Sequence, residues 1–167
     1  MGRILNRKGH GLDTILAVAV VFGLALTLLI GVYTYDKFVD IAENSTMNDS
    51  STAMTAMKDM QTHNNLWDYV VLLVFFGFVL AMMILGYFVD VHTIFFPLFI
   101  LVMLIGVILA SVFSYVWDKI ADTSTFTVLK VASFPITSHL MDNLVVYYTI
   151  AAGLALIATY AKTRGDA

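Results

Sequence analysis

Four long stretches of the chain carry no Asp, Glu, Lys or Arg, and this feature constrains the fold more than any other. They cover residues 14–35, 69–89, 92–117 and 143–161. A helix needs about 20 apolar residues to cross the ~30 Å hydrocarbon core of a bilayer. Lipid offers backbone groups no hydrogen-bond partners, so each crossing segment should be helical. We therefore predict an all-α integral membrane protein with four transmembrane helices, at residues 13–35, 68–89, 93–117 and 142–161.

The composition excludes the main alternatives. The chain is 60% hydrophobic and 13% charged, whereas soluble domains carry about 25% charged residues. It has no cysteine, which rules out disulfides and thiolate chemistry, and its net charge of −3 gives no general attraction to nucleic acid. We expect residues 1–167 to form a single four-span membrane domain whose partners are the lipid bilayer and other proteins.

The basic residues predict the orientation of the spans. Three of them precede the first span and two follow the fourth: Arg3, Arg7, Lys8, Lys162 and Arg164. Short loops rich in Lys and Arg stay on the cytoplasmic side of a membrane. We therefore place both termini, and a tight turn at 90–92, on the cytoplasmic side or its virion or organelle equivalent. The connections 36–66 and 118–141 then face outward.

Aromatic residues mark the expected outer ends of all four spans, where amphipathic rings prefer to lie. These predicted interface anchors are Tyr33, Tyr35, Trp67, Tyr69, Tyr115, Trp117, Tyr147 and Tyr148.

The two outward connections should be structured. Residues 36–66 are amphipathic and predict an extramembrane helical hairpin, packed through Phe38, Ile41 and Ala42 against a row of methionines. Residues 118–141 are too apolar for a free loop and predict a segment along the membrane interface, which could also contact another subunit. The residues expected to dock a partner are Phe38, Ile41, Met54, Met57, Phe126 and Phe134.

Met54, Met57, Met60 and His63 follow one another at a spacing of three. Thioethers and imidazole are ligands that copper(I) accepts, and methionines are also ordinary packing residues. On a helix each step of three falls 60° short of a full turn, so Met54 and His63 point in opposite directions. We favour a packing seam, keep a copper site as the alternative, and expect no cofactor.

Small residues recur at steps of four within the spans, as in Ala19, Gly23, Thr27 and Gly31 of the first and Gly106, Ala110 and Ser114 of the third. Such rows let helix backbones approach closely in lipid. Ionisable residues lie only at the ends of the spans. Asp68 and Asp142 lie at predicted helix starts, where the helix dipole stabilises a carboxylate.

The chain shows no Ser-His-Asp set, HExxH motif or Walker loop, so we do not expect an enzyme. The favoured function is a non-catalytic structural subunit of a larger hetero-oligomeric assembly. Its membrane would be a cell membrane or the internal membrane of a virion, where it would link the bilayer to a protein shell. The alternatives are a holin-like or small-channel pore former and, less favoured, a copper-binding membrane protein.

Overall fold

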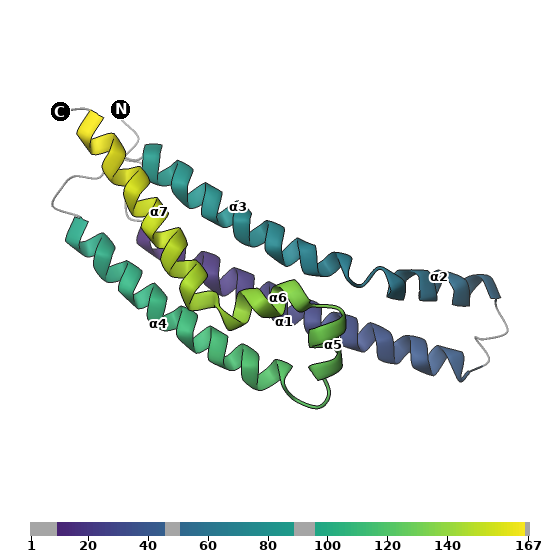
Figure 1. The fold of residues 1–167 in the computed structure, drawn as a ribbon. Coiled ribbons are helices and arrows are strands. Elements are labelled where there is room, and N and C mark those ends of the chain that lie inside the picture. Colours follow the sequence, from purple (N-terminus) through teal and green to yellow (C-terminus); the bar gives the residue numbers. More distant parts are fainter. Residues whose placement is uncertain (1–9, 46–50, 89–95, 166–167) are drawn as a thin grey trace, which may run out of the picture.

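The computed structural model describes residues 10–45, 51–88 and 96–165, and every regular element within these ranges is a helix (Figure 1). The helices are α1 (His10–Glu43), α2 (Ser51–Thr62), α3 (Leu66–Phe88), α4 (Phe96–Ala121), α5 (Thr127–Ala132), α6 (Pro135–Asp142) and α7 (Leu144–Gly165). The turn expected at 90–92 and the basic residues Arg3, Arg7 and Lys8 lie outside the described residues.

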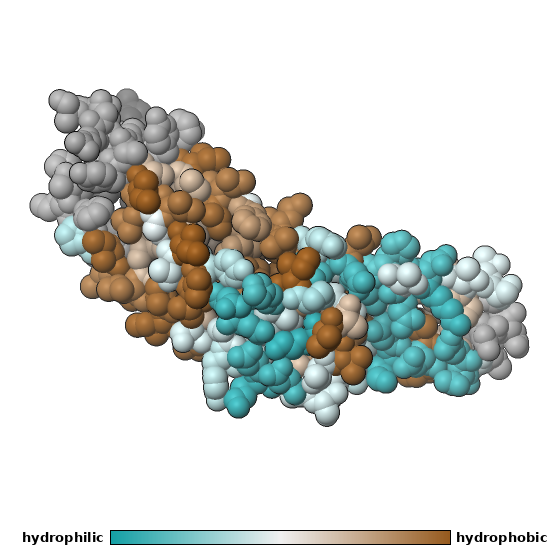
Figure 2. Space-filling model, viewed as in Figure 1, coloured by the Kyte–Doolittle hydropathy of each residue, from teal (hydrophilic) through white to brown (hydrophobic). Residues whose placement is uncertain are grey.

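Three segments are long and apolar enough to cross a membrane: Ile15–Glu43, Leu66–Ile84 and Ile100–Ala121. A fourth candidate is the pair of α6 and Leu144–Ala158, which is bent by 73°. This confirms an all-helical protein with three to four candidate membrane-spanning helices. Apolar side chains such as Leu73, Leu104 and Ile157 are exposed along these helices, and hydrophobic residues cover much of the bundle in Figure 2.

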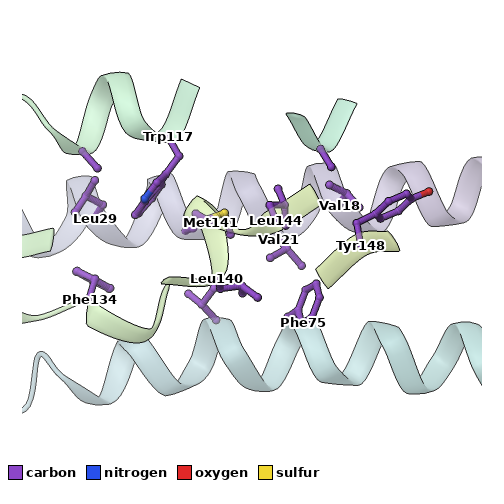
Figure 3. Packing of buried hydrophobic residues seen from close by; sticks show 14 of the residues in the cluster. Val18, Val21, Leu29, Phe75, Trp117, Phe134, Leu140, Met141, Leu144 and Tyr148 are labelled. Carbon is purple, nitrogen blue, oxygen red and sulfur yellow. The ribbon is translucent and has the colours of Figure 1, made fainter. Parts of the chain in front are cut away.

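The bundle has one continuous core. α7 packs against α3 and α4, and α1 packs against α3 and α4. Figure 3 shows side chains from these helices and from α6 directed into the shared interior, among them Val21, Trp117, Met141 and Tyr148. Trp117 and Tyr148 were predicted as interface anchors, but both are fully buried within the chain, so neither ring is open to lipid headgroups. The packing of α6 and α7 onto α4 encloses both rings.

The close approach predicted for the third span occurs at Gly106. A Cβ at this position would overlap the ring of Tyr148, and the Tyr148 hydroxyl lies 3.8 Å from the Met103 sulfur. Gly106 therefore provides the space into which the large α7 side chain fits. The small-residue row of α4 is used for packing within the chain.

The predicted hairpin is present, and of its three predicted packing residues Ala42 is confirmed, whereas Phe38 and Ile41 are wrong. α1 continues to Glu43 and pairs with α2 through Val39, Ala42 and Met54. Phe38 and Ile41, which were expected to face the methionines, are 47% and 68% exposed. The reason is that α2 covers the same side of α1 that forms the bundle core below it, and Val39 lies on that side.

The segment 118–141, predicted to lie along the membrane interface, contains two short helices in place of a loop. α5 and α6 occupy it, and Pro135 begins α6, a position that tolerates its missing N–H. Thr137, Ser138, Leu140 and Met141 are buried, because α6 inserts against α3 and α4. Its α5 end keeps the exposed character that the sequence suggested.

Candidate docking surface

A buried carboxylate joins α3 to α6 at the hairpin end of the bundle. Asp68, in the first turn of α3, is 2% exposed. Its two oxygens accept the backbone N–H groups of Ile136 at 2.8 Å and Thr137 at 2.6 Å. The residue before α6, Phe134, makes no side-chain cap. Asp68, which belongs to α3, therefore caps the N-terminus of α6. A negative charge at this end is also stabilised by the dipole of α6.

An ion network holds α5 against its neighbours. The Lys130 ammonium lies 2.9 Å from Asp122, 3.5 Å from Asp142 and 3.8 Å from Asp118, and the Lys130 side chain is 15% exposed. Burial alone would lower the pKa of Lys130, but the hydrogen bond to Asp122 and the charges of Asp142 and Asp122 outweigh it and raise that pKa. The ammonium thus stays charged and ties α5 to the ends of α4 and α6.

The lysine of α5 is turned toward its carboxylate partners, and two valines of the same helix are exposed. Val128 and Val131 are 74% and 72% exposed, and we call this pair the α5 patch. The same helix packs inward through Leu129, which contacts the bundle core. In Figure 2 a hydrophobic group stands over α5 among hydrophilic residues. The α5 patch is therefore an apolar surface set within the polar end of the molecule.

Two of the three phenylalanines predicted to dock a partner, Phe126 and Phe134, pack within the chain instead. Phe134 is fully buried in the core. Phe126 is half-buried, and its ring meets that of Tyr33 edge to face at 5.2 Å. Both therefore hold α5 and α6 in place, and neither offers a free surface of the kind the sequence suggested.

The remaining predicted anchors are distributed as follows: Trp67, Tyr69 and Tyr115 are exposed, and Tyr33, Tyr35 and Tyr147 are half-buried. The exposed rings fit an interfacial position. The half-buried ones also make contacts inside the chain, such as the hydrogen bond that the Tyr35 hydroxyl donates to the Met57 carbonyl at 3.0 Å.

The methionine run is divided by the hairpin. Met54 is buried and Met57 packs beside it, as a packing seam predicts. Met60 is 62% exposed, and a ring nitrogen of His63 lies 2.6 Å from the Asp59 carbonyl. The geometry thus gives Met54 and Met57 a packing role.

Polar contacts complete the hairpin. The Asp36 carboxylate accepts hydrogen bonds from the side-chain amides of Gln61 and Asn64, both at 3.1 Å. Lys58 pairs with Glu43 near the tip. These contacts fix α2 on α1 and give the projecting part of the protein a defined shape.

Comparison with known protein families, with curated proteins and with solved structures found no match. The candidate docking surface is therefore inferred from the geometry of the described residues. Sequence reasoning missed the α6 cap because Asp68 lies 68 and 69 residues from the groups it caps. It missed the Lys130 network because the network depends on how α5 turns back toward α4 and α6. A signal for the α5 patch was present, since Val128 and Val131 flank the one lysine between Lys119 and Lys162.

Proposed function

We propose that the protein is a non-catalytic membrane subunit of a larger assembly, in a cell membrane or the internal membrane of a virion, and that it docks another protein through its hairpin end. The observation that carries this proposal is the α5 patch. Exposed apolar residues along the membrane-spanning helices can be covered by lipid. The α5 patch is exposed as well, but the hydrophobic group over α5 in Figure 2 is surrounded by hydrophilic residues. Exposed apolar patches of this kind mark interaction sites.

The construction of the patch supports a role in recognition. Lys130 gives up most of its hydration to pair with three carboxylates. A lysine that pointed into water would not need these partners. The Asp68 cap and the buried Phe134 fix α6, which in turn supplies Asp142 to Lys130. A preorganised surface loses less conformational entropy when a partner binds.

The proposed topology has four spans, with both termini on the cytoplasmic side. It is supported by the basic residues of the terminal segments. It also agrees with Figure 1, where α1 begins and α7 ends at one end of the bundle while the hairpin and α5 lie at the other. The α5 patch would then face outward, toward a protein layer beyond the bilayer.

The test is affinity purification of the full-length protein from its own source in mild detergent. The double variant Val128→Thr and Val131→Thr keeps side-chain shape but makes the patch polar. The matched control, Val112→Thr and Val146→Thr, makes the same change at two exposed valines on α4 and α7. We expect a protein partner to be retained by the wild type and the control and lost from the α5 variant. Equal recovery from all three would sink the proposal.

The pore-forming alternative gains no support from the threonines. The hydroxyls of Thr27, Thr34 and Thr149 each donate to the carbonyl four residues earlier in their own helix. The proton of each hydroxyl is therefore used within its own helix, and only the oxygen can still accept a hydrogen bond. A dye-leakage assay with the purified protein in liposomes separates the two functions, and rapid leakage would favour a pore.

A further inference from the structure

The carboxylates of the Lys130 network outnumber the ammonium that they share. Asp122, Asp142 and Asp118 lie 2.9, 3.5 and 3.8 Å from the Lys130 nitrogen. One ammonium balances the charge of one carboxylate, so the network carries two negative charges in excess. Carboxylates that share a site repel one another, and this repulsion favours the binding of a proton by one of them.

The members of the network come from elements that pack together. Asp118 lies in the last turn of α4, and Asp142 is the last residue of α6. α6 packs against both α4 and α5. The Ser114 hydroxyl of α4 also donates to the Asp142 carbonyl at 3.3 Å. The charge state of the network therefore affects how firmly α4 and α6 hold α5.

Asp118 and Asp142 form the part of the network that can hold a proton. Asp122 makes the shortest contact with Lys130 and can balance the ammonium by itself. The other two carboxyl groups, one from α4 and one from α6, lie within hydrogen-bonding reach of each other. A protonated carboxyl group donates a hydrogen bond, which a carboxylate cannot do. One proton on this pair would replace a repulsion between α4 and α6 by a hydrogen bond.

Other titratable groups lie on the elements packed against α5 and α6, and they make contacts outside the network. These contacts are Lys119 with the Tyr115 ring on α4, His139 of α6 with the Tyr147 ring, Tyr33 of α1 with Phe126, and Asp68 of α3 with the N-terminus of α6. Histidine is the side chain that ordinarily titrates between about pH 5 and 8. A pH-dependent change at α5 must therefore be separated from the titration of His139.

We infer that mild acid places one proton between Asp118 and Asp142, and that this proton tightens the hold of α4 and α6 on α5. Lys130 stays charged and paired with Asp122 during this change. The closed junction binds the proton more tightly than an open one, so its stability rises as the pH falls and is lost as the pH rises. The fold thus contains a pH-sensitive brace for α5.

The brace is a property of this chain alone, so it does not depend on the proposed function. It would make the α5 patch more rigid in mild acid, and a rigid surface loses less conformational entropy when a partner binds. The purified protein is sufficient to test it.

Hydrogen exchange of the full-length protein in detergent micelles, at about pH 7.5 and about pH 5, is the test. The intrinsic chemical rate at each pH is divided by the measured rate, which removes the direct effect of pH on exchange and gives a protection factor. We expect the protection factor of residues 127–132 to rise about threefold from the higher to the lower pH.

Asp142→Asn is the decisive variant, because its amide is uncharged at both pH values and can donate a hydrogen bond to Asp118. We expect the variant to show the acid level of protection at both. Asp118→Asn supplies the same amide from α4 and should behave alike. The controls are His139→Gln and Asp59→Asn, the latter at an exposed aspartate of the hairpin. Both controls should keep the wild-type response to pH.

Wild-type protection that is equal at the two pH values, or lower in acid, overturns the brace. A wild-type response that survives in both asparagine variants, or that disappears in His139→Gln, assigns the proton to another group and also overturns it. Fluorescence of the buried Trp117 reports whether each variant is folded. If Asp142→Asn does not fold, Asp118→Asn decides the question. Each of these results leaves the Val128 and Val131 experiment unaffected.

Discussion

Replacing Asp68 by Ala tests whether the fold depends on the cap that α3 provides for α6. The change removes both acceptors of the Ile136 and Thr137 N–H groups, at 2.8 and 2.6 Å. Hydrogen bonds to a charged group contribute about 1.5–3 kcal/mol each, so two give about 3–6 kcal/mol. Water that enters the vacated space would recover part of this. We expect Asp68→Ala to lower the free energy of unfolding by about 3–5 kcal/mol, a large share of the usual 5–15 kcal/mol.

Asp68→Asn separates charge from shape. The amide keeps one oxygen acceptor but loses the negative charge and adds N–H groups that need partners. We expect a smaller loss of about 1.5–3 kcal/mol. Asp59→Ala is the control, because Asp59 is an exposed aspartate on the hairpin, and exposed substitutions usually change stability by less than about 0.5 kcal/mol.

The assay is reversible unfolding in mixed detergent micelles, followed by tryptophan fluorescence. The chain has two tryptophans; Trp67 is exposed and Trp117 is buried in the core. A Trp67→Phe background therefore reports on Trp117 alone, beside the core that α6 completes. A loss below about 1 kcal/mol for Asp68→Ala would refute the reasoning, because two buried N–H groups would then cost almost nothing to leave unpaired.

Three further predictions concern packing and charge. Gly106→Ala must displace the Tyr148 ring and should cost about 1–3 kcal/mol, with a double-mutant cycle to Tyr148→Leu showing coupling of at least about 0.5 kcal/mol; additive losses would contradict the contact. Lys130→Met should make α5 more sensitive to limited proteolysis, and unchanged cleavage of the variant would contradict the network. In the wild type, the pKa of Lys130 is raised above 10.5. Protection of α5 from proteolysis should therefore persist to pH 10 and be lost only as the pH rises through the raised pKa. Met54→Ala should destabilise the hairpin by about 2 kcal/mol or more and Met60→Ala by less than about 0.5 kcal/mol, measured by hydrogen exchange of α2; equal effects would contradict the packing seam.

The features that the sequence predicted well are local ones. Four uncharged stretches of this length predict long apolar helices from length and hydropathy alone, and three to four helices that could cross a membrane are present. The hairpin followed from an amphipathic pattern that continues past Tyr35. The position of Gly106 at a close contact followed from a row of small residues, although its partner Tyr148 did not.

The features that escaped prediction depend on contacts between distant residues. Phe38 and Ile41 seemed suited to face α2, but the core face of α1 decides which side the hairpin uses. Trp117 was predicted as an interface anchor from its residue type and its place at the end of a span. It is a core residue because α6 packs against α4. Asp68 lies 68 and 69 residues from the groups it caps, a separation at which no sequence pattern identifies a partner.

The most direct test of the account is native mass spectrometry of the full-length protein, extracted gently from its own membrane. The account predicts a hetero-assembly in which this chain is bound to at least one other protein, and that the complex dissociates when Val128 and Val131 are both changed to Thr. A wild-type spectrum that contains this chain alone, as a monomer or a homo-oligomer, would contradict the proposed docking function.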